Sequence, residues 1–140
     1  MDTLRLTDKI DFGILYDVEA GRYSPEWLEK NNITREKVIA LGPSIFTHTF
    51  GFEMDGKPIG GICVGNGESH IAVLPQYHGR WGRLWRPALE RLLLIQNPII
   101  AKPEAWNKSA IRFLERAKFR RIKEDEHFVT FEGTRELLGL

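Results

Sequence analysis

The 140-residue sequence predicts an α+β fold, an α/β sandwich in which helices flank a mixed, mostly antiparallel central sheet. Three observations predict it. The first third of the chain has apolar residues at helical spacing, and two residues that favour a helix N-cap, Ser24 and Thr34, precede later runs in it. The middle has two short turn signals, Asp55-Gly56 and Gly65-Asn66-Gly67, between runs that favour strands. The last part alternates helix-like stretches with short strands, so both element types continue to the end of the chain.

In the N-terminal part, we expect a short strand over residues 3–6 and then helices. Apolar residues at near-helical spacing from Ile10 to Val18 indicate the first helix. Ser24 before Pro25 is typical of an N-cap followed by proline at the first helical position. Thr34 is a second N-cap, for a run that we expect to end near Gly42.

From residue 45 the pattern changes to that of strands. A β-rich run reaches the hairpin signal at Asp55-Gly56 and resumes from Pro58 to Val64, which predicts two antiparallel strands. After the second turn, the segment from His70 to Leu74 is short and apolar enough for a buried central strand, and Pro75 ends it.

A loop, residues 76–83, separates this strand from a helix-like run that begins at Leu84. Pro87 would fall inside that helix, so we expect either a later start or a kink. A strand over Ile99–Lys102 and a helix over residues 107–118 follow. Residues 120–124 and 127–132 form a terminal strand pair in this prediction.

Size and composition predict a single domain over residues 1–140, with 42% hydrophobic and 28% charged residues. No run of eighteen apolar residues occurs and no secretory signal is present at the N-terminus, so we expect a cytoplasmic protein without a membrane span. The single cysteine, Cys63, cannot form an internal disulfide, and four dispersed histidines add no zinc framework, so we expect no metal. We expect Cys63 to be a small core residue rather than a nucleophile.

Charge is unevenly distributed, although the whole chain has a net charge of only +1. Residues 1–70 hold seven Lys or Arg against eleven Asp or Glu, and residues 71–140 hold thirteen against eight. The net charges are therefore −4 and +5. A basic half is typical of a site for an anion, and equally of helices whose outer faces Lys and Arg solvate.

The loop after the central strand carries the clearest chemical signal. Gly79 and Gly82 permit close approach of the backbone to a ligand, and a helix N-terminus follows, which is an arrangement suited to phosphate oxygens. Arg80 and Arg83 add positive charge. Glycines also occur in structural turns, so the spacing alone leaves both interpretations open.

These residues resemble the GCN5-related N-acetyltransferase (GNAT) superfamily, in the form of a divergent, compact member such as those found in phages. The family's pyrophosphate loop has the pattern Gln/Arg-x-x-Gly-x-Gly/Ala, and residues 76–80 match its first five positions, with Trp81 at the sixth. Downstream, the matching positions of the family's Asn-x-x-Ala helix and the following aromatic residue are Asn107, Ala110 and Phe119.

Two positions near the C-terminal helix depart from the family pattern. Leu114 stands where the family often has a tyrosine general acid, and Lys118 stands where a glycine usually precedes the last aromatic residue. Trp81 is a third departure, and its side chain would either face outward or obstruct the nucleotide.

The resemblance implies a GNAT-like sheet and acetyl-CoA as cosubstrate, bound between the central strand and the strand at Ile99. The loop amides of residues 78–82 would contact the pyrophosphate, and the strand backbone would pair with the pantetheine. The cofactor-binding residues it implies are Val73, Leu74, Gln76, His78, Gly79, Arg80, Trp81, Gly82, Arg83 and Asn107.

Acetyl transfer to an amine needs a base for the amine proton and a donor for the leaving thiolate. Glu68 and His70, at the start of the central strand, are the candidate bases, with simple surface placement beside the turn as the alternative. Tyr77 is a candidate substitute for the missing acid, although a loop tyrosine is also a common packing residue.

Two functions follow from these observations. The first is an acetyl-CoA-dependent N-acyltransferase acting on an amine of a small molecule or protein. The alternative is a catalytically inactive GNAT-fold protein that serves as a binding or structural component, with a protein partner. The basic stretch over residues 102–123 leaves nucleic-acid binding as a weaker third hypothesis that lacks a recognisable module. The oligomeric state, including a homodimer, stays open.

Overall fold

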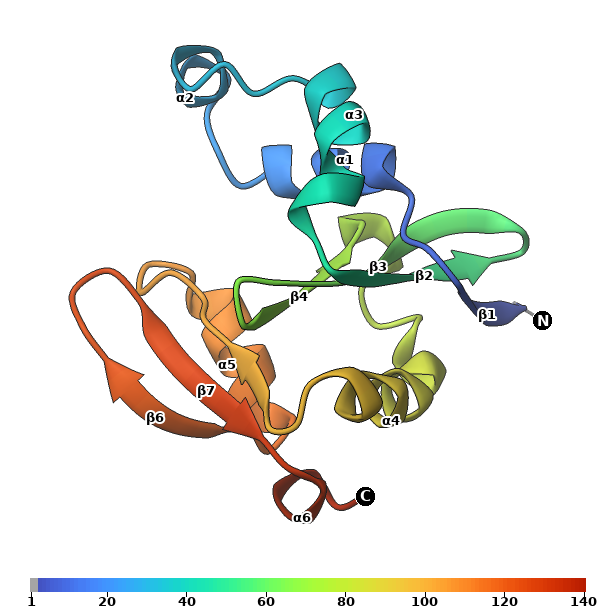
Figure 1. Ribbon diagram of the computed structural model, residues 1–140, viewed down its shortest axis with the longest axis vertical. Helices are drawn as coiled ribbons and strands as arrows, with labels where there is room; N and C mark the ends of the chain where they lie inside the picture. The colour runs from blue at the N-terminus through green and yellow to red at the C-terminus, as the bar shows by residue number, and fades with distance from the viewer. Residues whose placement is uncertain (1–2) are drawn as a thin grey trace. The chain divides into compact units, whose positions relative to one another are not determined.

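The structure is a computed structural model that describes residues 3–140 (Figure 1). Its contacts divide the chain into two compact units. The N-terminal unit contains the residues up to 66 together with 70–85, and the C-terminal unit contains residues 67–69 and 86–140. The described strands form two sheets, one with the order β1-β2-β3-β4 and one with the order β5-β7-β6. The α+β class predicted from the sequence is confirmed.

Antiparallel pairing organises the N-terminal sheet. Its strands are β1 (Leu4–Thr7), β2 (His48–Met54), β3 (Lys57–Gly65) and β4 (Glu68–Val73). The two predicted turns are present, because Asp55 and Gly56 have φ of 53° and 78°, and Asn66 and Gly67 have φ of 52° and 74°. Such left-handed pairs close two-residue hairpins whose twist matches that of the strands.

β3 and β4 approach each other closely at Gly60. A Cβ atom built at this glycine would lie 2.0 Å from the carbonyl oxygen of Ala72 and 2.8 Å from the Cα of Val73. Both contacts are with backbone, which cannot swing away as a side-chain end can. Gly60 is therefore required for the position of β4 against β3, and thereby for the start of the loop that follows β4.

Three helices lie between β1 and β2 in the chain and occupy one side of β2 and β3 (Figure 1). They are α1 (Phe12–Ala20), α2 (Pro25–Lys30) and α3 (Arg35–Ile45). The Ser24 hydroxyl accepts a hydrogen bond from the Trp27 amide at 3.1 Å and the Thr34 hydroxyl accepts one from Lys37 at 3.2 Å, as their predicted N-cap roles require.

The predicted end of the third helix was wrong by one turn. We expected it near Gly42 and a strand from residue 45, but α3 continues through Pro43 to Ile45. A proline near the end of a helix removes one amide donor, and the last turn closes here through the Phe46 amide, which donates to the Gly42 carbonyl at 3.2 Å.

The N-terminal unit has a core where α1 packs on the sheet. Its buried members are Ile10, Leu15, Val18, Cys63 and Ala72. Burial of these side chains, at about 25 cal/mol per Å² of apolar surface, stabilises the packing of α1 on the sheet.

The C-terminal unit contains α4 (Trp85–Ile95), whose first residue is the last of the N-terminal unit, and β5 (Ile99–Ala101). α5 (Lys108–Arg116), β6 (Arg120–Glu124), β7 (Val129–Gly133) and α6 (Arg135–Leu138) follow. β7 lies between β5 and β6, antiparallel to both (Figure 1). For the helix around Pro87 we expected either a later start or a kink, and the later start is confirmed. α4 begins at Trp85, so that Pro87 falls in its first turn.

The last helix, α6, was not predicted, although Thr134 has the N-cap role, with its hydroxyl accepting from the Leu137 amide at 3.2 Å. Gln96 connects three segments of the C-terminal unit. Its Oε1 accepts from the Ser69 hydroxyl and from the Ile100 amide, and its Nε2 donates to the Gly67 carbonyl. Within residues 3–140, no helix is long and apolar enough to cross a membrane.

Candidate phosphate-binding loop and helical pocket

The end of β4 leads into a loop whose first contacts are set by His78. The Leu74 amide donates to the Ile59 carbonyl at 2.9 Å, so this residue faces β3. Because neighbouring residues of a strand direct their backbone groups to opposite edges, Val73 directs its own to the other edge. His78 Nε2 lies 2.9 Å from the Val73 carbonyl oxygen. Since a carbonyl only accepts, Nε2 carries the proton and donates.

Two tight turns shape the loop, one over Pro75–Tyr77 and one over Gly82–Leu84. The His78 amide donates to Pro75 at 3.1 Å and the Arg80 amide donates to Tyr77 at 3.0 Å. Of the five loop amides expected at a pyrophosphate, these two are therefore already used inside the loop.

Gly79 and Gly82 differ from their neighbours in this respect. In the part of the chain that the structure describes, neither amide has an acceptor. A Cβ atom built at either glycine would have nothing within 4 Å, and Gly79 has a φ of 81°, which favours glycine. The loop thus has two N–H donors without an acceptor and free space at both glycine Cβ positions, and unpaired backbone amides in a turn can bind an anion.

Positive side chains accompany these donors. Arg80 and Arg83 are both exposed, and the Arg80 guanidinium lies over the Tyr77 ring, 5.5 Å from its centroid. Gln76 is exposed in the first turn. The loop therefore combines two guanidinium groups with two backbone donors, and a phosphate group is the ligand that such a set fits.

The Trp81 side chain faces the interior of the N-terminal unit. It is 8% exposed, stacks on Phe52 with a centroid distance of 5.2 Å, and meets the Trp85 ring edge-on at 5.6 Å. It therefore neither faces outward nor covers the loop glycines. The two orientations that we expected for this side chain are therefore both wrong, and Trp81 instead anchors the loop by packing on Phe52.

Glu68 and His70 are two residues apart in β4 and so lie on one face of that strand. Glu68 is half-buried, whereas His70 is exposed and its ring meets the Phe46 ring edge-on, with centroids 6.3 Å apart. Tyr77 follows in the first turn of the loop, half-buried beneath Arg80. Their catalytic roles remain predictions.

The family-pattern residues of the C-terminal unit have structural roles there. The Asn107 Oδ1 accepts from the Ala110 amide at 3.2 Å and so caps α5. Leu114 is 5% exposed and belongs to the core, whereas its neighbour Phe113 is 37% exposed. Asn107 remains a predicted contact of the cosubstrate.

Lys118 shows why this position favours glycine. It has a φ of 74°, and the helix end around it is a Schellman motif in which the Phe119 amide donates to Leu114 and the Lys118 amide donates to Glu115. A glycine at this position would have no steric penalty at such a φ. The strained lysine could have been found from the sequence, since the residue after a helix end is commonly left-handed.

Cys63 is fully buried and has no disulfide partner. Burial, reinforced by the charge of Glu19, raises the pKa of the Cys63 thiol to about 12. The thiol is therefore protonated at neutral pH, which confirms its interpretation as a core residue and not a nucleophile.

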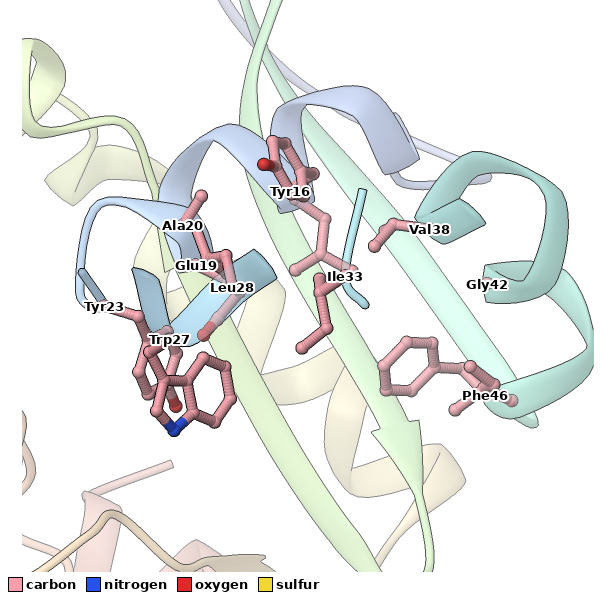
Figure 2. Close-up of a pocket in the computed structure, with 12 residues that line it drawn as sticks. Tyr16, Glu19, Ala20, Tyr23, Trp27, Leu28, Ile33, Val38, Gly42 and Phe46 are labelled. Atoms are coloured by element: carbon pink, nitrogen blue, oxygen red, sulfur yellow. The ribbon is translucent and has the colours of Figure 1, made fainter. Parts of the chain in front are cut away.

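A pocket between α1, α2 and α3 was not predicted from the sequence. It has a volume of about 270 Å³ and is lined by twelve residues of the three helices and their connections (Figure 2). They include Tyr16, Tyr23, Trp27, Leu28, Ile33 and Phe46. The signal in the sequence was the number of apolar residues on α2 and α3 without a helical stripe to bury them, which leaves Trp27, Ile39, Leu41 and Ile45 exposed.

Comparisons with known proteins identify the fold of the chain. No protein-family model matches the sequence, and no curated protein matches it. Among solved structures, the PaiA N-acetyltransferase of Thermoplasma acidophilum, in complex with coenzyme A, superposes with a TM-score of 0.66 at 16% identity, over 94% of this chain and 99% of that chain. The chain has the GNAT fold.

Two further structures with the GNAT fold agree. The N-acetyltransferase PseH of Campylobacter jejuni matches with a TM-score of 0.62 at 16% identity, over 96% of this chain and 98% of that one. The ribosomal-protein-S18-alanine N-acetyltransferase of Escherichia coli matches with a TM-score of 0.57 at 19% identity, over 95% and 93%. The resemblance inferred from the loop residues is thus confirmed at the level of the fold.

Proposed function

We propose that this protein is an acetyl-CoA-dependent N-acyltransferase that acts on an amine. The observation that carries the proposal is the pair of unpaired amides at Gly79 and Gly82, each with open space at its Cβ position, between the exposed Arg80 and Arg83. Unpaired backbone donors without a side chain to shield them, on a loop that leads into a helix, suit the pyrophosphate of a nucleotide-containing cosubstrate.

The residues at the end of β4 and in the loop fit such a cosubstrate. Gly79 and Gly82 would donate to its phosphate oxygens, and the two arginines would neutralise its charge. Val73 directs its backbone to the edge of β4 away from β3, with its carbonyl already bonded to His78, so its amide is the group that would pair with the pantetheine. When bound, acetyl-CoA supplies an activated acyl thioester.

The chain's own groups would handle the proton of the acceptor amine. Glu68 and His70 share one face of β4, and either can accept the ammonium proton so that the neutral amine attacks. Tyr77 supplies a phenol within the first turn of the loop and would donate to the leaving thiolate. Leu114 supplies no proton, because it is a buried hydrocarbon at the position where the family often has an acid.

Isothermal titration of the protein with acetyl-CoA tests the cosubstrate. We expect saturable binding that Gly82→Leu weakens at least tenfold, because the new side chain fills the space beside the amide. Arg80→Gln is expected to weaken binding several-fold, and Arg112→Gln is the matched control, an exposed arginine on α5 outside the loop. Absence of binding by the unmodified protein at millimolar acetyl-CoA would overturn the proposal.

A second function is favoured by one observation, the burial of Leu114 in place of an acid. In this alternative the protein binds CoA without transferring the acyl group and acts as a binding or structural component. Incubation with acetyl-CoA and a panel of amines separates the two. Free thiol released in proportion to acetylated amine supports the enzyme, whereas acetyl-CoA binding with no transfer to any amine supports the inactive protein.

A further inference from the structure

The pocket between α1, α2 and α3 is unlike the loop in its chemistry. Its lining is formed by aliphatic and aromatic side chains, and Glu19 is the one charged residue among the twelve (Figure 2). Tyr23 and Trp27 stack at 4.3 Å and form one of its walls, while Phe46 forms part of another. Such a lining favours an apolar group, with a small number of polar atoms to orient it.

The volume excludes the cosubstrate as occupant. About 270 Å³ lies just below the usual range of pockets for drug-sized ligands, about 300–1,000 Å³. A nucleotide with phosphates would not fit, and no arginine or lysine lines the walls to pair with its charge. An aromatic ring or a branched alkyl group of a few carbon atoms is the size of group that the space admits.

The pocket adjoins the face of β4 that carries the candidate bases. Phe46 lines the pocket and its ring also contacts the edge of the His70 ring, with centroids 6.3 Å apart. Phe46 packs on the core that contains Ala72, and Ala72 alternates onto the same face of β4 as Glu68 and His70. One aromatic ring thus separates the pocket from His70.

The carboxylate of Glu19 in the pocket wall affects which ligand charge the pocket accepts. Glu19 is half-buried and forms an ion pair with Arg22 at 3.2 Å, but Arg22 itself does not line the pocket. A carboxylate ligand would be repelled by Glu19 in this partly desolvated setting, so the group that fills the pocket carries no negative charge.

We propose that this pocket is the acceptor subsite, and that the acceptor is a primary amine carrying an aromatic or branched apolar group that fills the space between α1, α2 and α3. That the amine is acylated rests on the proposed acyltransferase function. That the pocket binds the amine rests on the pocket alone. It names a substrate class, apolar amines, in preference to polyamines, amino sugars or acidic compounds.

Direct binding in the absence of acetyl-CoA tests the pocket independently of catalysis. The probe is phenethylamine, titrated by NMR or calorimetry, with 3-phenylpropionate and ethanolamine as comparisons of opposite charge and of absent apolar group. We expect phenethylamine to bind at least fivefold more tightly than either. Glu19→Gln is expected to reduce this preference over 3-phenylpropionate.

Two tryptophan substitutions on α3 form a matched pair. Val38 lines the pocket, whereas Ile39 beside it is 45% exposed and does not. Val38→Trp should fill the pocket and weaken phenethylamine binding at least tenfold, and Ile39→Trp should leave it within twofold. Far-UV circular dichroism and melting curves confirm that both variants are folded. Equal binding by both variants would overturn the proposal.

The acetylation assay then separates the two hypotheses. With acetyl-CoA, Val38→Trp should raise the KM for phenethylamine at least tenfold, whereas Ile39→Trp, which lies outside the pocket, should leave it within twofold. If phenethylamine binds but no amine is acetylated, the proposed enzyme function fails and the pocket stands only as an amine-binding site. The pocket proposal fails if acetyl transfer occurs but phenethylamine does not bind. It also fails if light scattering shows a dimer that Val38→Trp and Ile39→Trp both disrupt, since α3 would then be an interface.

Discussion

Replacing Gly60 by alanine tests how β4, and the loop that follows it, are positioned. The new Cβ would lie 2.0 Å from the Ala72 carbonyl oxygen, and real Cβ atoms are essentially never closer than 3.0 Å to another atom, so the two strands must separate by about 1 Å. That movement would lengthen the 2.9 Å hydrogen bond from Leu74 to Ile59 beyond the normal range.

The cost follows from these two effects. Loss of one backbone hydrogen bond costs about 1 kcal/mol, and the forced backbone shift costs about 1–3 kcal/mol. We therefore expect Gly60→Ala to lower the free energy of unfolding by about 2–4 kcal/mol, a large part of the about 5–15 kcal/mol typical of a domain. The melting temperature should fall by roughly 10 °C.

Urea denaturation followed by tryptophan fluorescence measures this difference. Gly82→Ala is the matched control, because its Cβ would meet nothing within 4 Å and its φ is not in the left-handed region. We expect the control to change stability by less than about 1 kcal/mol. If Gly60→Ala proved as stable as Gly82→Ala, the argument for close approach of β3 and β4 would be refuted.

Three further predictions concern single residues. Lys118→Gly should raise the free energy of unfolding by about 1 kcal/mol in urea denaturation, because glycine has no penalty at a φ of 74°, and an unchanged or lower value would contradict the strained turn. Trp81→Ala should cost about 3–5 kcal/mol in the same assay, since it removes a buried ring stacked on Phe52, and a cost below 1 kcal/mol would mean that the ring is not buried. The pKa of Cys63 is about 12 in the folded protein and near 9.0 when unfolded. The contribution of the buried thiol to the free energy of unfolding is therefore intact below pH 9 and is lost as the pH rises from 9 towards 12, by about 1 kcal/mol per pH unit. The stability of Cys63→Ala should fall less steeply over that range, and parallel curves would contradict the raised pKa.

Much of the fold could be predicted because its signals are local. Ser24 and Thr34 cap the helices that follow them, and Asp55-Gly56 adopts the left-handed pair that a two-residue hairpin demands. The predicted strand before Pro75 is β4, which ends as expected at Val73 but lies at the edge of its sheet and not at its centre. In each case one or two neighbouring residues determine the geometry, so no knowledge of distant contacts was needed.

The site could be predicted only in part, because its remaining features depend on tertiary contacts. The glycines at 79 and 82 can be read from the sequence. The two turns, however, decide which amides are free: those of His78 and Arg80 donate within the loop, whereas those of Gly79 and Gly82 have no acceptor. The inward direction of Trp81 depends on Phe52, which is far away in the sequence. The pocket, likewise, forms only when three helices with weak apolar patterns come together.

The most direct test of the central claim is to observe the loop amides during acetyl-CoA binding. In ¹⁵N-labelled protein, the backbone resonances of Gly79 and Gly82 can be followed through a titration, with Gly56 and Gly139 as left-handed glycines elsewhere in the chain. The account predicts saturable shifts at Gly79 and Gly82 that are among the largest in the spectrum and occur with little change at the two reference glycines. Saturable binding that leaves the Gly79 and Gly82 amides unperturbed would contradict it.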